Sequence, residues 1–190
     1  MNERKNIVIA ISGLHGVGKT VQAKRVAEAF GLRHVSGGAI FRSLAKEKNL
    51  SIIELSKNAE ESDEIDKLID GRMVEEGKKG NVVIDSMLCA WFLKDVALIK
   101  IFLTAPDNVR FERIAKRDKK SFSEAYQETV AREASEMARF KKYYGLSISD
   151  VKDTCHLILS TEDLSEDDVF VILKSYIQLR LKNAFGVQRC

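Results

Sequence analysis

One eight-residue stretch constrains the fold more than any other part of this sequence. Residues 13–20 read GLHGVGKT, which satisfies the pattern GxxxxGK[ST], and the apolar run 7–11 precedes them. Apolar residues then recur at helical spacing up to Gly31, a residue that commonly ends helices. The motif therefore lies between a strand and a helix, the context in which it forms a phosphate-binding loop (P-loop).

Each position of this loop has a chemical role in such a site. Glycines let the backbone wind closely enough for successive amides to point at phosphates, and the helix N-terminus adds partial positive charge. We expect Lys19 to neutralise the β- and γ-phosphates and Thr20 to ligate magnesium. The alternative, a glycine-rich turn that binds nothing, is disfavoured because every fixed position and both flanks agree. The candidate nucleotide-binding residues are Gly13, Gly16, Val17, Gly18, Lys19 and Thr20.

The rest of the chain alternates apolar runs with helical stretches. The runs lack polar alternation, which is typical of strands buried on both faces of a parallel sheet. Strand alternating with helix predicts an α/β fold. A closing amphipathic helix is expected at 165–185. The expected strands are 7–11, 81–85, 98–104, 156–160 and, more weakly, 33–36.

Two charged helical stretches, 39–79 and 113–144, have no adjoining strand and are expected to be insertions on this scaffold. Pro106 suits the first turn of a helix that includes Phe111. The length of 190 residues, without repeat or linker, fits one domain.

Charge, cysteines and hydropathy exclude several classes of protein. Lysine and arginine total 31 against 28 acidic residues, a formal +3 that does not indicate a nucleic-acid partner. Cys89, Cys155 and Cys190 are far apart, which is typical of reduced thiols in a cytoplasmic protein. The apolar run 7–11 is too short for a signal peptide or a membrane span. We therefore expect a cytoplasmic protein without a membrane partner.

Asp85 follows the apolar residues 82–84 at the carboxyl end of a predicted strand. Ligands of open α/β sheets bind at that edge. We expect Asp85 to contact the magnesium through water, and the alternative is a solvated carboxylate at a strand end.

Arginines are concentrated in two other helical stretches. Arg132 and Arg139 are two turns apart and so project from one helix face, suited to stabilising a transferring phosphoryl group. The alternative is a solvated helix with ion pairs to the interleaved Glu133 and Glu136. The remaining arginines of this set are Arg110, Arg113 and Arg117.

Two further segments are candidates for binding an acceptor. Residues 34–42 predict a strand, a turn and a helix start, with Arg42 as a clamp for an acceptor phosphate or, alternatively, a plain surface arginine. Asp66 and Asp70 are four residues apart, on one helix face. By themselves they indicate only an acidic helix.

Together these motifs resemble nucleoside monophosphate kinases, most closely the compact archaeal type of cytidylate kinase, over almost the whole chain. The shared features are the P-loop, Ser36-Gly37, Phe41-Arg42, the Ile65-Asp66 and Ile69-Asp70 repeat, Ala105-Pro106, residues 113–117, and residues 132–139 leading to Tyr143-Tyr144-Gly145.

The resemblance implies a five-stranded parallel sheet in the order 2-3-1-4-5 with helices on both faces. It also implies a mobile monophosphate-binding insert at 36–79 and a mobile lid at 113–146, on a single domain spanning 1–190. The implied activity is ATP-dependent phosphorylation of CMP or dCMP by a monomer or weak homodimer. The implied cofactors are ATP and Mg²⁺.

The resemblance also implies roles for individual residues. Ser36, Gly37 and Arg42 would bind the acceptor phosphate, and Asp66 and Asp70 would lie near the acceptor base. The transferring phosphoryl group would be met by Lys19, Arg117, Arg132 and Arg139. Thr20 and Asp85 would bind the metal.

One departure from the family pattern concerns the acceptor. The family has a glycine and a phosphate-gripping arginine after the third strand, where this chain has Ser86 and Met87. Loss of such a charged hydrogen bond costs roughly 1.5 to 3 kcal/mol. Arg72 or Arg110 are candidates to compensate. The departure leaves open a related kinase with another acceptor, or an ATP-binding regulatory or assembly protein with little transferase activity.

Overall fold

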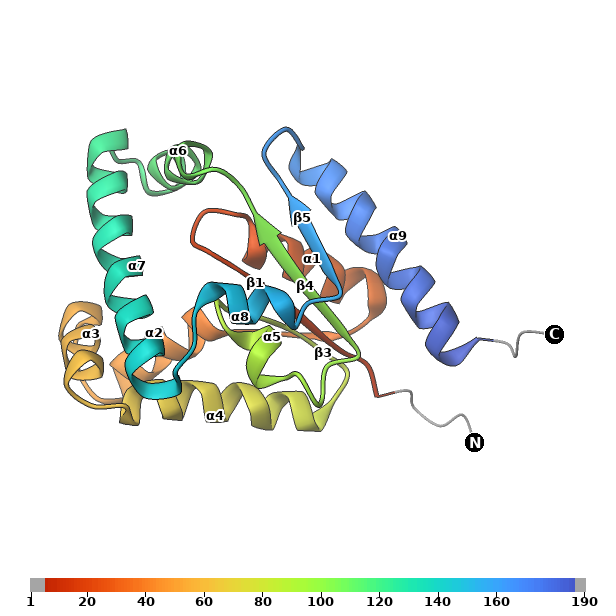
Figure 1. Cartoon of the computed structure of the whole chain (residues 1–190), viewed down its shortest axis with the longest axis horizontal. Coiled ribbons are helices and arrows are strands. Elements are labelled where there is room, and N and C mark those ends of the chain that lie inside the picture. The colour runs from red at the N-terminus through yellow and green to blue at the C-terminus, as the bar shows by residue number, and fades with distance from the viewer. Residues whose placement is uncertain (1–5, 187–190) are drawn as a thin grey trace.

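The computed structural model describes residues 6–186, and its centre is one all-parallel sheet (Figure 1). The strand order is β2-β3-β1-β4-β5, as expected from the resemblance. All five predicted strands are present within a few residues of their expected limits. They are β1 (Val8–Gly13), β2 (Arg33–Ser36), β3 (Val82–Asp85), β4 (Ile99–Thr104) and β5 (Leu157–Ser160).

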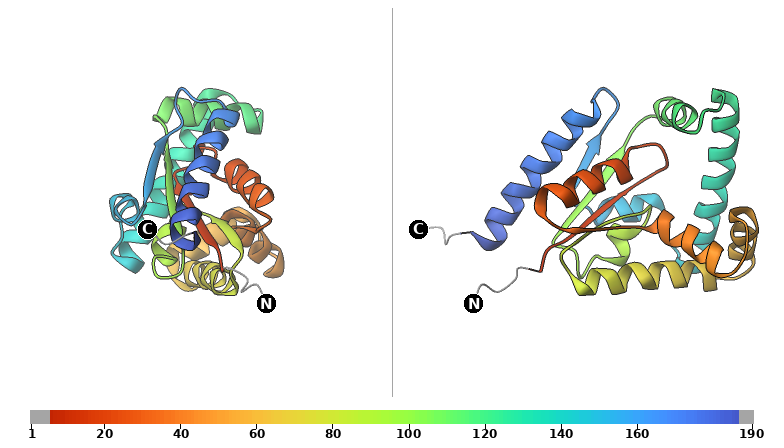
Figure 2. Two further views of the ribbon diagram at one scale, coloured as in Figure 1. Left: turned by 90° about the vertical axis from the view of Figure 1, so that its right-hand side faces the viewer. Right: turned by 180° about the vertical axis from the view of Figure 1, so that it is seen from behind.

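Helices cover both faces of the sheet. Figure 2 shows α1 and α9 side by side over one face, and the other helices lie on the second face or beyond the carboxyl edge of the strands. The helices are α1 (Lys19–Phe30), α2 (Gly37–Glu47), α3 (Ile52–Glu61), α4 (Glu64–Lys79), α5 (Cys89–Phe92), α6 (Asp107–Asp118), α7 (Phe122–Tyr144), α8 (Ile148–Asp153) and α9 (Glu166–Phe185).

Alternate residues of β1 belong to two separate hydrophobic cores. Ile9 and Ile11 pack with α1 and α9, whereas Val8 and Ala10 pack with the helices of the opposite face. Successive side chains of a strand point to opposite faces, so a central strand covered on both sides is apolar throughout. This explains why the apolar run of β1 has no polar alternation.

Two helical segments extend from the sheet where insertions are predicted. Helices α2, α3 and α4 occupy the first, and α6 with α7 the second. Pro106 is the N-cap residue of α6, which runs without interruption to Asp118. The predicted lid boundary at Arg113 therefore falls inside a helix. No helix within residues 6–186 combines the length and apolar character needed to cross a lipid bilayer.

The P-loop between β1 and α1 uses two glycines with similar backbone angles and different surroundings. Gly16 has φ +81° and Gly18 has φ +88°. A Cβ on Gly16 would lie 2.5 Å from the carbonyl oxygen of Arg110 in α6, whereas a Cβ on Gly18 would meet nothing within 4 Å. The loop therefore packs against the backbone of α6 at one glycine only.

These two glycines provide a matched pair of substitutions. Gly18→Ala incurs only the left-handed backbone cost of about 1 to 2 kcal/mol. Gly16→Ala incurs the same cost and also forces the α6 backbone away, so we expect it to lower the free energy of unfolding distinctly more. Urea titrations of both variants measure the difference, and equal losses would contradict the close packing of loop and helix.

Candidate active site

The carboxyl ends of three adjacent strands bring the predicted site residues to one edge of the sheet (Figure 1). In the parallel register, Ser36 of β2 and Ile11 of β1 both pair with Asp85 of β3. The P-loop leaves β1 directly after this point. The sheet itself therefore places the loop and Asp85 side by side.

Asp85, which is 2% exposed, is the centre of a hydrogen-bond cluster. Thr20 Oγ1 donates to Asp85 Oδ2 at 2.7 Å, and Ser36 Oγ donates to the same oxygen at 3.3 Å. His34 Nε2 lies 2.6 Å from Asp85 Oδ1. The structure thus brings together Thr20 and Asp85, the two predicted metal ligands. It also adds His34, which from the sequence we interpret only as a structural residue beside a strand.

Oxygen donors of this kind suit magnesium, which prefers one or two protein oxygens together with phosphate oxygens and water. Within residues 6–186, no group of three or more histidine, cysteine or acidic side chains is arranged to hold a metal ion. The Thr20 hydroxyl and the Asp85 carboxylate therefore fit a magnesium ion that arrives with a phosphate ligand.

The side chain of Lys19 bonds to the backbone of its own loop. Its Nζ donates to the carbonyl oxygen of Leu14 at 2.6 Å. Burial lowers the pKa of Lys19 to about 8, against the opposing charges of Asp85 and Glu136. A bound phosphate would give this ammonium a close anionic partner and so raise the pKa of Lys19 again.

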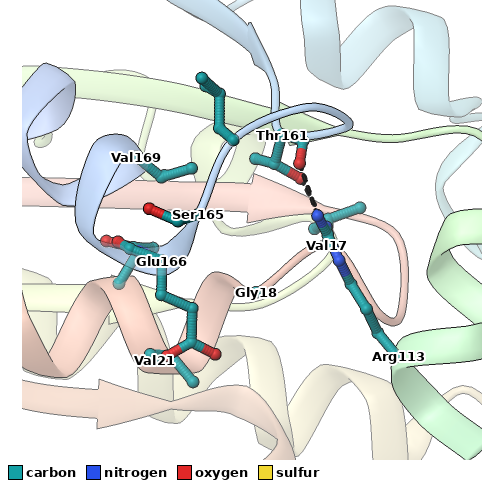
Figure 3. Close-up of a pocket in the computed structure, with 10 residues that line it drawn as sticks. Val17, Gly18, Val21, Arg113, Thr161, Ser165, Glu166 and Val169 are labelled. Atoms are coloured by element: carbon teal, nitrogen blue, oxygen red, sulfur yellow. Dashed lines mark hydrogen bonds between the residues drawn. The ribbon is translucent and has the colours of Figure 1, made fainter.

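A cavity lies beside the P-loop (Figure 3). Arg113 of α6 forms one side of it, with Nη1 donating to Thr161 Oγ1 at 2.8 Å and Nη2 donating to the Thr161 carbonyl at 2.5 Å. The cavity measures about 140 Å³. Sequence reasoning missed Thr161, although its place just after β5, at the same edge of the sheet, is a usable signal. The apolar part of the lining is Val17, Val21, Leu164 and Val169.

The three predicted phosphoryl-contacting arginines occupy different environments. Arg117 is exposed and pairs with the neighbouring Asp118. Arg132 is also exposed and pairs with Glu136 one turn along α7. Arg139 is buried, and its Nε donates to Asp66 Oδ2 at 2.8 Å.

Arg132 and Arg139 lie two turns apart on the single helix α7, but their surroundings differ: Arg132 is exposed, whereas Arg139 is buried against Asp66. The alternative of intrahelical ion pairs applies to Glu136, which pairs with Arg132, and not to Glu133, which pairs with Arg110 of α6.

The two acids of α4 connect the first insertion to α7. Asp66 pairs with Arg139, and Asp70 Oδ2 accepts a hydrogen bond from the Tyr144 hydroxyl at 2.7 Å. Burial raises the pKa of Asp70 to about 7 and also raises that of Tyr144. The residues predicted near an acceptor base thus hold the end of α7 on α4.

Arg42 and Met87 define the acceptor side. Arg42 is exposed, its Nη1 lies 3.4 Å from where a Cβ on Gly38 would stand, and it has no hydrogen bond or ion pair to any described residue. Met87 is only 7% exposed and packs in the hydrophobic core. Of the two candidates to compensate for the missing arginine, Arg72 forms an exposed ion pair with Glu47, and Arg110 is engaged in a buried ion pair with Glu133.

Sequence reasoning also missed a polar cluster at the tip of the P-loop. His15, to which the sequence assigned no chemistry, contacts Glu133 and Glu136 of α7. Helical periodicity shows which residues share a face, and it does not show which of two glutamates turns toward a loop 118 residues away. Of the cysteines, Cys89 and Cys155 are free thiols, and Cys190 lies outside the described residues.

A five-stranded parallel sheet in this order with a P-loop defines the class of P-loop kinases. Two solved structures show the same fold. They are a shikimate kinase from Bacteroides thetaiotaomicron (TM-score 0.61, 16% identity, 95% of this chain and 99% of that chain) and a gluconokinase from Sinorhizobium meliloti (TM-score 0.59, 15% identity, 98% and 100%).

Sequence comparisons narrow this class. The AAA domain family matches residues 9–130. A cytidylate kinase from Staphylothermus marinus is 46% identical over 93% of this chain and 99% of the relative. Another from Pyrococcus horikoshii is 43% identical over 92% and 90%. The chain belongs to the cytidylate kinase family of nucleoside monophosphate kinases, which confirms the resemblance seen in the sequence.

The raised pKa of Asp70 predicts a pH dependence of stability. A carboxyl group whose folded pKa lies above its unfolded value of about 4 stabilises the fold below that pH, and this contribution is lost as pH rises through about 7. Asp70→Asn keeps an oxygen for Tyr144 and removes the titration. We expect the loss of stability between pH 4 and 7 to be smaller in Asp70→Asn than in the wild type. Urea titrations across this range measure it, and parallel profiles would contradict the burial argument.

Proposed function

We propose that the protein transfers the γ-phosphoryl group of ATP to CMP or dCMP in the presence of Mg²⁺. The main support for the proposal is that Lys19, Thr20 and Asp85 lie close together at the edge of the sheet. It occurs in a chain whose relatives at 46% and 43% identity are cytidylate kinases.

The donor nucleotide has a complete set of partners. The P-loop amides and Lys19 bind its phosphates, and Thr20 with Asp85 holds the metal. The cavity between Arg113 and Val169 adjoins the loop and takes the base of ATP. When bound, Mg²⁺ neutralises charge on the phosphates and orients them.

The acceptor binds on the side of α2. Ser36 and Gly37 form the turn into this helix, and Arg42, which lacks an anionic partner in the described part of the chain, supplies the charge for the acceptor phosphate. The phosphate oxygen of a nucleoside monophosphate is already ionised, so no general base is needed. Catalysis then consists of positioning and charge stabilisation.

The arginines differ in how readily they reach the transferring phosphoryl group. Arg117 and Arg132 are themselves exposed, at 66% and 58%, so each can leave its carboxylate partner at little cost. Arg139 is buried against Asp66, and a buried charge leaves its partner only for another anion. We therefore propose a closed state in which Arg139 binds the transferring phosphoryl group in place of Asp66. Closure of α7 would also exclude water, which competes as an acceptor.

An assay of ADP formation tests the proposal. The protein is incubated with ATP, Mg²⁺ and, separately, CMP, dCMP, UMP, AMP, GMP or dTMP. We expect turnover with CMP or dCMP, and none with Lys19→Ala because the phosphates lose their cation. Thermal unfolding of Lys19→Ala checks that it is folded. Turnover by the folded variant would contradict the assignment of the P-loop, and ATP binding without any turnover would favour a regulatory role.

The Ser86-Met87 turn favours a second candidate, a kinase of this family with weakened or altered acceptor recognition. Met87→Arg restores the charged contact, and the long arginine stem can cover the apolar surface that Met87 covers now. If CMP is the acceptor, we expect the KM for CMP to fall about ten- to a hundredfold.

The matched control is Met87→Leu, which keeps an apolar side chain of similar size and should leave the KM for CMP unchanged. An unchanged or raised KM in Met87→Arg would show that the acceptor is a different molecule.

A further inference from the structure

Helices α6 and α7 both form hydrogen bonds with His15, at the tip of the P-loop. The His15 amide donates to Glu133 Oε1 of α7 at 3.0 Å, and the His15 carbonyl accepts from Arg110 Nη1 of α6 at 2.8 Å. The two polar groups of one backbone residue are therefore bonded to the opposite members of an ion pair. In Figure 1, α6 and α7 lie beyond the carboxyl edge of the sheet, on the side of this loop.

The ion pair is buried and fully bonded. Arg110 Nη1 lies 2.7 Å from Glu133 Oε1 and Nη2 lies 3.1 Å from Oε2, and the two side chains are 2% and 8% exposed. Asp107 Oδ1 accepts from Nη2 at 2.7 Å and from Nε at 3.3 Å. With the His15 carbonyl, each of the five guanidinium N–H groups has an acceptor.

A third contact connects the same loop residue to α7. His15 Nε2 lies 2.7 Å from Glu136 Oε2. Burial acts to raise the pKa of Glu136, but the hydrogen bond and charge of His15 and the charge of Arg132 lower it to about 2. Glu136 is thus an ionised carboxylate held between the loop and Arg132.

We infer that Arg110 and Glu133 are positioning residues for phosphoryl transfer, whose ion pair sets the tip of the P-loop and docks α7 beside it. This inference rests on the proposed function. Helix α7 carries Arg132 and Arg139, so the position of both arginines relative to the loop depends on this contact. Neither Arg110 nor Glu133 needs to touch a phosphate.

The chemistry of the pair indicates that it orients the P-loop rather than stabilises the fold. A buried ion pair contributes little net stability compared with well-packed apolar residues. Apolar residues, however, could not bond to the amide and carbonyl of His15, whereas Arg110 and Glu133 bond to both. The pair therefore supplies a specific geometry that a hydrophobic contact cannot supply.

Loss of the pair should affect turnover more than ATP binding. The remaining loop amides and Lys19 still bind the phosphates, so the KM for ATP changes little. The arginines of α7 lose their docked position, and misplacement of such groups by about 1 Å lowers turnover by roughly a hundredfold. A purely structural pair would instead lower the unfolding temperature and leave kcat unchanged in the folded protein.

The test uses Glu133→Gln, Arg110→Met and the variant with both changes. Glu133→Gln keeps an oxygen for the His15 amide and removes the charge. The control is Arg33→Met, which breaks an ion pair between the amino end of β2 and Glu76 of α4, at the opposite edge of the sheet. Values of kcat and KM for ATP and CMP are measured well below each unfolding temperature.

We expect each single variant to lower kcat by about ten- to a hundredfold with the KM for ATP changed less than about threefold. The double variant should be no slower than the slower single variant, because each change removes the same contact. Arg33→Met should retain the wild-type kcat. Wild-type kcat in the folded single variants, multiplied losses in the double variant, or an equal loss in Arg33→Met would each overturn the inference.

Amide hydrogen exchange separates failure of this inference from failure of the proposed function. If the wild type phosphorylates no nucleoside monophosphate, the proposed function fails. The docking of α7 on the loop can still be tested by measuring amide hydrogen exchange in peptides that cover residues 13–20 and 122–144. We expect Glu133→Gln to speed exchange in both peptides relative to Arg33→Met, and unchanged exchange would overturn the docking role.

Discussion

The pairing of β1 with β3 and β4 in parallel register is the constraint on which the rest of the structure depends. Because β1 is buried on both faces, its apolar residues determine the register, and every strand ends at the same edge. The strand register therefore brings the P-loop, Asp85 and Ser36 together at this edge. The Thr20 to Asp85 hydrogen bond is a direct consequence of that register.

The two helical insertions are connected to this edge by buried ion pairs. Arg110 and Glu133 join α6 and α7 to the loop, and Arg139 and Asp66 join α7 to α4. The Arg110–Glu133 pair contacts the P-loop, whereas the Arg139–Asp66 pair engages an arginine that the proposed reaction needs. In the mechanism that we propose, phosphoryl transfer combines a fixed contact at the P-loop with an exchangeable one at Asp66.

The sequence predicted the scaffold well because its signals are local. The apolar run of β1, the glycines around Lys19 and the position of Asp85 each depend on neighbouring residues and a repeating period. The partner of Arg139 could not be predicted, since helical spacing does not show which acid across an interface a guanidinium meets. The same holds for His15, whose partners come from a helix more than a hundred residues later.

Transfer of labelled phosphate in a single turnover tests the central claim most directly. Enzyme in excess is mixed with ATP labelled at the γ-phosphate, Mg²⁺ and CMP, and the products are separated after acid quenching. The account predicts label in CDP, at its β-phosphate, with little label in inorganic phosphate because the site excludes water. Label found only in inorganic phosphate, or remaining in ATP at all times, would contradict it.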